Sequence, residues 1–189
     1  SAQNSREDVL LMKAMNCNAI LAGHYPADRH FLDACDQLGL MVVEELFSWI
    51  RPLPDAEGTR LVHEMVYRDQ NHPGIVLWAN GNHFAFNPNL EAVFRESDLQ
   101  QRRALHMESR KAKLPEPATP GLVPVDTRFY PIYNELLERL KSPYPVCPFE
   151  TLHALYDGGG GASLADYMAA IEGSPNGGGL FIWEMVDEA

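Results

Sequence analysis

Short apolar runs recur along the chain, and polar side chains follow each of them closely. The runs cover residues 18–22, 40–43, 75–79, 145–149 and 179–183. Continuous apolar runs of this length are typical of strands buried on both faces, as in a parallel sheet. The polar residues that follow are His24, Glu44, Glu45, Asn80, Asn82, His83, Glu150 and Glu184. An α/β barrel collects its active site at such strand ends.

Amphipathic stretches separate the apolar runs. Apolar residues recur at helical spacing within residues 31–38, 61–66, 132–140 and 164–171. We expect helices there, with Gly39 as a C-cap and Asp28 and Ser163 as N-caps. Strand alternating with helix predicts parallel βα units and therefore an α/β fold.

Proline and glycine mark the expected loops. Residues 51–58 and 113–124 contain several prolines, which stop helices and strands, so we expect surface loops in both places. The glycine runs at 158–161 and 177–179 are also expected to be loops. Neither glycine run has the GxGxxG or Walker spacing that would indicate a nucleotide site.

The composition indicates a single domain over residues 1–189. With 46% hydrophobic and 22% charged residues, the chain can bury a sizeable core. No apolar run has the length of a membrane span and the first residues lack the apolar core of a signal peptide, so we expect no membrane partner. The compartment stays open between periplasm, cytoplasm and the extracellular space. The net charge of -11 argues against nucleic acid as a partner, because phosphate binding needs a basic surface.

The cysteines carry no signature of a metal site. Cys17, Cys35 and Cys147 lie in apolar segments and lack the spacing of metal ligands. Their odd number also argues against a disulfide framework. We interpret them as buried free thiols.

Several motifs stand in a fixed order along nearly the whole chain. In chain order they are residues 11–13, Asn16, and residues 18–19, 24–26, 35–36 and 39–40. Residues 68–78 and 81–82 follow, and Glu150 and residues 153–154 and 178–187 come last. Together these motifs resemble the catalytic barrel of family 2 glycoside hydrolases, the relatives of β-galactosidase and β-glucuronidase. Residues 68–78 match the most specific motif of that family.

This resemblance implies a (β/α)8 TIM barrel. Its first strand would precede residue 1, because the helix expected around residues 8–15 would follow that strand. The chain would then be the catalytic domain of a longer protein that also carries β-sandwich domains. The implied activity is hydrolysis of a β-linked carbohydrate with retention, which needs two carboxyl groups about 5–5.5 Å apart, one as nucleophile and one as acid and base. No cofactor is expected.

The resemblance gives a matching residue for one catalytic role and a different residue type for the other. Glu150 matches the nucleophile, which attacks the anomeric carbon and forms a glycosyl-enzyme. The acid/base position after Asn82 holds His83, where the family has a glutamate. An imidazole can do acid and base work near neutral pH, so His83 is either an unorthodox acid/base or a sign of lost activity. A neighbouring carboxylate could also have taken over, and the candidates by position are Glu44, Glu45 and Glu184.

Sugar-binding roles follow from the same resemblance. The matched positions are His24, Asn82, Tyr130, His153 and Trp183. Trp183 would offer a ring face on which the apolar side of a pyranose can stack. Tyr130 matches a tyrosine that hydrogen-bonds the nucleophile, but the alignment is loose there and Tyr133 competes for the role.

Two departures from the family pattern change the expected site. Leu21 occupies the position of an arginine that normally supports the charge of the nucleophile. Residues 47–51 replace the metal-ligand pattern of the β-galactosidase branch, so we expect no magnesium site.

Two alternative functions stay open. A barrel that keeps Glu150, His24 and Trp183 but lacks the usual acid could bind a carbohydrate without hydrolysing it. The imidazoles of His24, His83 and His153 with Glu150 could instead hold zinc or another divalent metal for hydrolysis, although no HxH or HExxH spacing supports this. The sequence does not choose among galactose, glucuronic acid, mannose or another glycone.

Overall fold

The computed structural model describes residues 1–83, 85–107, 123–153 and 160–185. The chain divides into two compact units, Ser1–His106 and Met107–Ala189. We call the first the sheet unit and the other the second unit. The assignment of residues 1–189 to one domain stays a prediction.

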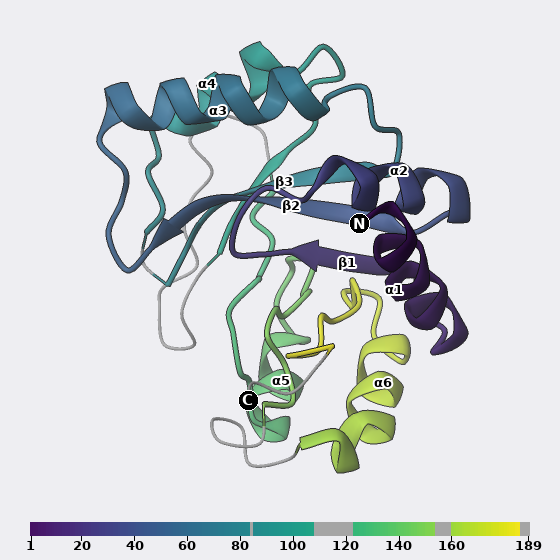
Figure 1. Ribbon diagram of the computed structural model, residues 1–189. Helices are drawn as coiled ribbons and strands as arrows, with labels where there is room; N and C mark the ends of the chain where they lie inside the picture. The colour runs from purple at the N-terminus through teal and green to yellow at the C-terminus, as the bar shows by residue number, and fades with distance from the viewer. Residues whose placement is uncertain (84, 108–122, 154–159, 186–189) are drawn as a thin grey trace. The chain divides into compact units, whose positions relative to one another are not determined.

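A parallel sheet frames the sheet unit (Figure 1). Its strands are β1 (Ala19–Ala22), β2 (Met41–Trp49), β3 (Ile75–Asn82) and β4 (Ala104–His106), in the spatial order β1-β2-β3-β4. Each strand pairs in parallel with the next along the chain, so the predicted α/β class is confirmed. We did not predict β4, because a strand of three residues gives no apolar run long enough to recognise.

β2 runs further than predicted and is irregular near its end. Leu46 pairs with Asn80 while Trp49 pairs with Asn82, with a register shift between them. Three steps along β2 therefore oppose two along β3, which is a β-bulge. Bulges bend and twist a strand and are common beside active sites, where they redirect side chains. This bulge lies beside Asn82, directly before His83.

Helices cover the sheet in the described part of this unit. They are α1 (Ala2–Ala14), α2 (Arg29–Leu38), α3 (Asp55–Asp69) and α4 (Leu90–Ser97). The helices predicted at 31–38 and 61–66 are confirmed as α2 and α3. Both predicted caps of α2 are confirmed: the Asp28 side chain accepts a 2.9 Å bond from the His30 amide, and Gly39 ends the helix at a left-handed φ of 71°.

The predicted loop at 51–58 is wrong in its second half, because α3 already begins at Asp55. Pro54 stands at the N-cap, and acidic residues in the first turn favour the positive end of the helix dipole. Gly58 lies within α3 where this helix meets α4. A Cβ at Gly58 would lie only 2.6 Å from Cδ1 of Leu90, so the missing side chain allows close packing there. Proline and glycine thus start and pack this helix rather than interrupt it.

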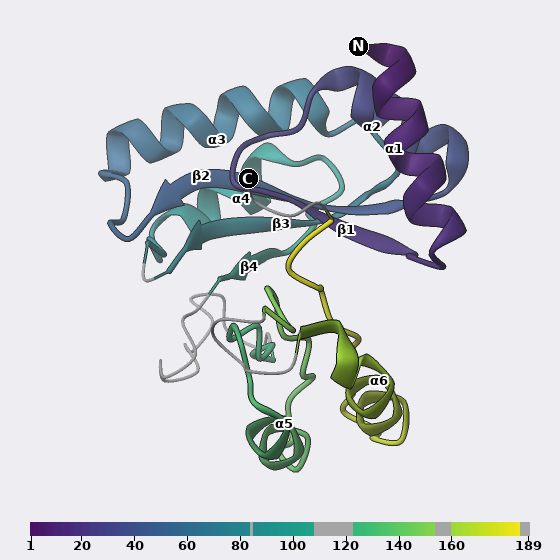
Figure 2. The same cartoon turned by 60° about the horizontal axis from the view of Figure 1, so that its bottom comes forward.

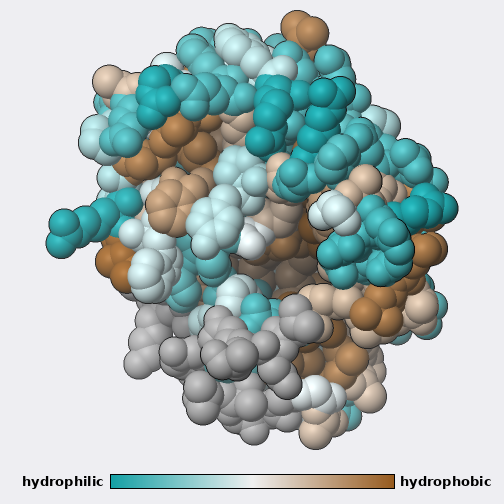
Figure 3. Space-filling view, in the orientation of Figure 1, coloured by the Kyte–Doolittle hydropathy of each residue, from teal (hydrophilic) through white to brown (hydrophobic). Residues whose placement is uncertain are grey.

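One hydrophobic core joins these helices to the sheet. Its buried members include Val9, Leu32, Cys35, Leu40, Val42, Leu46, Val62, Val66, Ile75, Trp78, Leu90 and Phe94. Trp78 is fully buried: its ring packs 6.3 Å from that of Phe94 and its Nε1 donates to Asp98 at 3.0 Å. Figure 2 shows α3 running along the sheet, and Figure 3 shows hydrophilic side chains over the outer surface of that helix. The helices therefore occupy one face of β2 and β3.

The second unit has less regular structure. Its helices are α5 (Tyr133–Arg139) and α6 (Leu164–Glu172), preceded by the 3₁₀ helix η1 (Gly160–Ser163). The helices predicted at 132–140 and 164–171 are confirmed. Ser163 stands at the predicted N-cap of α6, but its side chain makes no capping hydrogen bond. The core of this unit comprises Leu136, Leu140, Val146, Leu152, Tyr167 and Ile171.

The strands predicted at 145–149 and 179–183 are present only as isolated parallel bridges. Val146 pairs with Asp126 and with Gly177, and Thr151 pairs with Ile182. Pro145 and Pro148 lack the N–H groups that a longer ladder would need. The prediction was right about the direction of pairing and wrong about its extent.

Parts of the predicted loops fall outside the described residues. Of the loop at 113–124, the structure describes only the last two positions, and of the glycine run at 158–161 only Gly160 and Gly161, which lie in η1 rather than in a loop. Residues 177–179 carry no helix or named strand, in agreement with the prediction.

The three cysteines are free, as predicted. Cys35 is buried, while Cys17 and Cys147 are half-buried. Burial raises the thiol pKa of both Cys35 and Cys147 to about 12, so neither is a ready thiolate. Among the described residues, no helix combines the length and the apolar character needed to cross a membrane.

Candidate active site

The predicted site residues divide between the two units. His24, Asn82 and His83 belong to the sheet unit, whereas Tyr130, Glu150, His153 and Trp183 belong to the second unit. In both units they lie at or just beyond a strand or a parallel bridge. This is the placement expected for a barrel active site.

His24 is the centre of a polar group in the sheet unit. The segment after β1 carries His24, β2 carries Glu45 and β3 ends with Asn82. The Asn82 amide nitrogen lies 3.1 Å from Nδ1 of His24, and Oε2 of Glu45 lies 3.6 Å from the same Nδ1. The His24 side chain is 31% exposed and that of Glu45 is fully buried. Residues from three neighbouring strand segments thus converge on one imidazole.

Glu45 is unusual for a buried carboxylate. Neither of its oxygens has a hydrogen-bond partner in the described part of the chain. Gly23 leaves the room for it, because a Cβ at Gly23 would lie 2.5 Å from Oε2 of Glu45. Glu45 was one of three alternative acids suggested by position, but its pairing with His24 had no sequence signal of its own.

The adjacent Glu44 lies on the opposite face of β2. It pairs with the core residue Trp78, whereas Glu45 pairs with Ala79. The Glu44 carboxylate accepts a 3.0 Å bond from the Ala27 amide and lies 3.5 Å from a guanidinium nitrogen of Arg68. Burial, and then the nearby Asp69 carboxylate, raise the pKa of Glu44 to about 8. Glu44 is therefore held within the fold, among the helices.

His83 follows directly after β3, in a tight turn. Its φ is 46°, in the left-handed region that L-residues seldom adopt. Gly81, at φ 79°, allows the turn to close, since a Cβ there would lie 2.5 Å from the Ala85 backbone. The Ala85 amide donates to the carbonyl of Asn82 at 3.1 Å. The backbone conformation of this turn therefore fixes the position of His83 after β3.

Aromatic side chains form an exposed surface beside His24. Tyr25 and Phe47 stack with ring centroids 5.5 Å apart, and Trp49 lies two residues further along β2. The exposed fractions of these three residues are 65%, 49% and 59%. Such ring faces suit the apolar side of a sugar.

Glu150 is the centre of the group in the second unit. It is 2% exposed and has a left-handed φ of 49°. The hydroxyl of Tyr130 donates a short hydrogen bond to its Oε2. Tyr133, the competing tyrosine, instead packs its ring against Tyr167 at 5.5 Å. The geometry thus connects Tyr130, and not Tyr133, with the carboxylate.

Two further rings extend this group from Tyr130. His153 meets Tyr130 edge to face at 5.7 Å and lies nearly parallel to Trp183 at 6.5 Å. The backbone holds them together, because the Trp183 amide donates to the carbonyl of Thr151 at 2.9 Å. The candidate residues of the second unit are therefore one connected group. Glu184, another alternative acid, is exposed.

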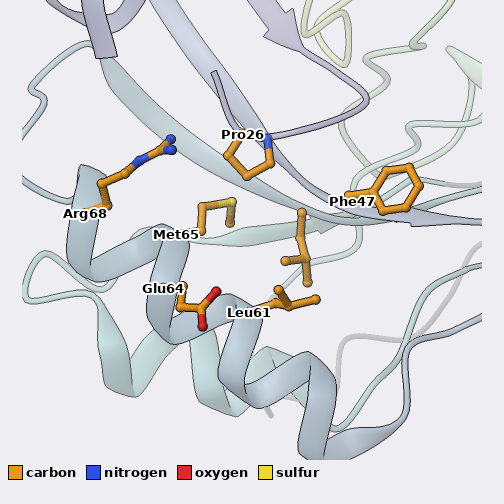
Figure 4. Close-up of a pocket in the computed structure, with 7 residues that line it drawn as sticks. Pro26, Phe47, Leu61, Glu64, Met65 and Arg68 are labelled. Atoms are coloured by element: carbon orange, nitrogen blue, oxygen red, sulfur yellow. The ribbon is translucent and has the colours of Figure 1, made fainter. Parts of the chain in front are cut away.

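A separate hollow lies between α3 and the end of β2 (Figure 4). Its volume is about 330 Å³, and its lining residues are Pro26, Leu46, Phe47, Leu61, Glu64, Met65 and Arg68. It contains none of the predicted site residues. Among the described residues, no group of three or more His, Cys, Asp or Glu side chains is arranged to hold a metal ion.

Comparison with solved structures identifies the fold as a TIM barrel fold. Bifidobacterium dentium β-glucuronidase, complexed with coumarin-3-O-glucuronide, matches with a TM-score of 0.78 at 20% identity, over 100% of this chain and 38% of that chain. Bacteroides uniformis β-glucuronidase 2, covalently bound to cyclophellitol-6-carboxylate aziridine, matches with a TM-score of 0.77 at 22% identity, over 100% of this chain and 29% of that chain.

Sequence comparison identifies the family. Residues 1–48 and 55–189 match the profile of the glycosyl hydrolases family 2, TIM barrel domain. The chain therefore belongs to family 2 of the glycosyl hydrolases. β-Galactosidase BgaC of Bifidobacterium adolescentis is 27% identical over 96% of this chain, which spans 20% of that relative.

Proposed function

We propose that this chain is the catalytic barrel of a retaining β-glycosidase with Glu150 as its nucleophile. The observation that carries the proposal is the environment of Glu150. A nearly buried carboxylate directly before the parallel bridge at Thr151 accepts a hydrogen bond from Tyr130. The retaining mechanism needs a carboxylate that attacks the anomeric carbon and then leaves.

Tyr130 positions this nucleophile. Its hydroxyl donates a hydrogen bond to Oε2, one of the two carboxylate oxygens of Glu150. A hydrogen bond to a carboxylate is among the stronger ones in proteins and favours the charged form. Tyr130 therefore keeps Glu150 in one orientation and ready to attack.

The rings of His153 and Trp183 supply a binding surface for the sugar. They are half-buried and nearly parallel, with an angle of 6° between their planes. A pyranose can place its apolar face on a ring and its hydroxyl groups against imidazole nitrogens.

His83 takes the acid/base role in this proposal. Protonation of the leaving oxygen requires a group that can carry a proton near neutral pH, and imidazole does so. The substitution of the family's glutamate by His83 also supports a second candidate function, which is carbohydrate binding without turnover. The two candidates differ in whether a glycosyl-enzyme forms and breaks down.

The substrate proposed is a β-linked carbohydrate. The names of the related proteins, β-galactosidase and β-glucuronidase, make galactose and glucuronic acid the first glycones to test. Because the aligned relative is about five times longer than the matched region, we also propose β-sandwich domains elsewhere in the intact protein.

Mass spectrometry after incubation with activated 2-deoxy-2-fluoro glycosides tests the proposal. Their leaving groups need little protonation, so labelling reports on Glu150 and does not depend on His83. We expect a glycosyl adduct on the peptide that contains Glu150, and no adduct in Glu150→Gln. Glu138→Gln is the matched control, because Glu138 lies in the same unit with a 72% exposed side chain.

The same assay separates the two candidate functions. Labelling of folded protein followed by reactivation supports a glycosidase. Saturable binding of the glycosides to folded protein, without any adduct, would support the binding protein and overturn the nucleophile. Loss of turnover in His83→Ala confined to substrates with poor leaving groups would support His83 as the acid; an equal loss for all substrates would contradict it.

A further inference from the structure

We propose that Glu45 is a positioning residue that holds a proton on Nδ1 of His24 and so presents Nε2 of that imidazole to the ligand. The juxtaposition behind it is a fully buried carboxylate 3.6 Å from a partly exposed imidazole. The inference rests on the proposed function only in taking the ligand to be a carbohydrate. The pairing itself is a property of the sheet unit.

The burial of Glu45 requires an explanation. Taking a carboxylate out of water without hydrogen bonds costs several kcal/mol, so buried polar groups nearly always have partners. Both oxygens of Glu45 lack a hydrogen-bond partner among the described residues. A buried carboxylate kept in this state points to a role outside the stability of the fold.

His24 can supply a hydrogen bond that the Glu45 carboxylate lacks. Nδ1 is the imidazole nitrogen nearest to Glu45, and a small closure of the 3.6 Å separation would give an N–H···O hydrogen bond. A neutral histidine carries its proton on one nitrogen only, and a carboxylate at one nitrogen fixes which. Glu45 therefore selects the tautomer with the proton on Nδ1.

Asn82 fits this arrangement after a half-turn of its amide. The amide nitrogen lies 3.1 Å from the same Nδ1 as Glu45. The oxygen and nitrogen of an asparagine side chain exchange places on rotation by 180°, so Asn82 can present its oxygen to a protonated Nδ1. Both neighbours then present an oxygen that can accept a hydrogen bond from Nδ1–H.

Two features keep Glu45 in place. Gly23 leaves room for Oε2 in its observed position, since a Cβ there would lie 2.5 Å from it. The alternation of side chains along β2 fixes Glu45 on the face opposite to Glu44. The carboxylate thus cannot exchange its partner for the Arg68 guanidinium that serves Glu44.

This tautomer has a consequence for the ligand. With Nδ1 protonated, Nε2 of His24 has a lone pair and accepts a hydrogen bond from a hydroxyl group. A ligand carboxylate has no proton to donate there and would be disfavoured. We therefore expect a sugar hydroxyl, and not an acidic substituent, at this point of the site.

Nitrogen-15 NMR of the intact protein labelled at histidine tests the proposal directly, because the chemical shifts of Nδ1 and Nε2 report which one carries the proton. His24→Phe identifies the His24 signals by their disappearance. We expect the Nδ1-protonated form in the unchanged protein. In Glu45→Met, which removes the acceptor at similar volume, we expect the Nε2-protonated form that histidine prefers in water.

A graded pair of variants provides the control. Glu45→Gln keeps a weaker acceptor and should change the His24 signals in the same direction but less. Glu44→Gln alters the neighbouring buried carboxylate on the other face and should leave them unchanged. Identical His24 signals in all folded variants would overturn the proposal, and so would equal changes in Glu44→Gln. If Glu45→Met does not fold, Glu45→Gln alone decides.

Turnover gives an independent readout. At metal sites, loss of an outer group that orients a histidine typically costs about 10- to 100-fold in activity, and we expect a fall of the same order in kcat/KM for Glu45→Met. Because the NMR result needs no turnover, a protein without glycosidase activity can still show the tautomer change. Failure of the proposed function and failure of this inference are thus distinguishable.

Discussion

The two faces of β2 treat adjacent glutamates differently. Glu44 and Glu45 are consecutive, and both are fully buried. On the helix-covered face, Glu44 meets the Ala27 amide at 3.0 Å and the Arg68 guanidinium at 3.5 Å. On the other face, Glu45 meets only the imidazole of His24, at 3.6 Å, among the described residues.

This difference shows that burial alone does not indicate the role of a carboxylate. Glu44 has donors supplied by the fold, and burial raises its pKa to about 8, so we expect its ionisation to affect the stability of the fold. Glu45 lacks such donors, and its partner is a side chain that also reaches the surface. The partners of a buried group, more than its depth, therefore separate a structural carboxylate from one that serves a ligand.

The largest expected effect concerns the pH dependence of stability at Glu44. Because the pKa of Glu44 is raised from 4.5 to about 8, the native state keeps a proton that the unfolded state loses. Its contribution is present below pH 4.5 and is lost as pH rises toward 8. We expect the free energy of unfolding to fall on the order of 3 kcal/mol over this range, measured by denaturant unfolding.

Glu44→Gln should remove this decline, because glutamine resembles the protonated acid at every pH. The variant should match the parent protein near pH 5 and exceed it in stability near pH 8. Glu64→Gln, at a 60% exposed side chain on α3, serves as the control and should keep the parent's decline. An unchanged slope in Glu44→Gln would place the titration elsewhere.

The comparison extends to a third buried carboxylate, Glu150, whose partner is a hydroxyl. Tyr130→Phe removes the hydrogen bond to Oε2. Hydrogen bonds to charged groups contribute about 1.5–3 kcal/mol, so labelling of Glu150 by the fluoro glycosides should slow by about 10- to 100-fold. Tyr133→Phe is the matched control, since Tyr133 is 39% exposed and packs against Tyr167. Equal rates for Tyr130→Phe and the parent would remove Tyr130 from the site.

The sequence predicted the regular parts of the molecule better than the irregular ones. Apolar runs of four or more residues predicted β1, β2 and β3, because a strand buried on both faces leaves a continuous apolar signal. The strand at 145–149 was predicted too long, since proline interrupts its ladder. The predicted start of α3 is late, because proline and glycine within 51–58 favour a loop by type, whereas in the structure Pro54 stands at the N-cap of the helix and Gly58 packs within it.

The site shows the same limit. The polar residues at strand ends were recognisable as candidates, but the sequence could not say which face each glutamate takes. Period-two alternation separates Glu44 from Glu45 only once the register with Trp78 and Ala79 is known. No sequence pattern indicated the role of Gly23, because this residue contributes only the space that a side chain would otherwise take from the Glu45 carboxylate.

The smallest expected effect concerns the space that Gly23 leaves for the Glu45 carboxylate. Gly23→Ala adds a Cβ 2.5 Å from Oε2 of Glu45. Because Oε2 is the far end of a flexible side chain, it can move away, and we expect a loss of only about 1 kcal/mol in unfolding free energy. The displaced carboxylate should release Nδ1 of His24, so the His24 NMR signals should change as in Glu45→Met. Gly161→Ala, where a Cβ would meet nothing within 4 Å, should alter neither quantity. A destabilised Gly23→Ala with unchanged His24 signals would show that Gly23 serves packing alone, and Glu45 would then resemble Glu44 more closely than its partners indicate.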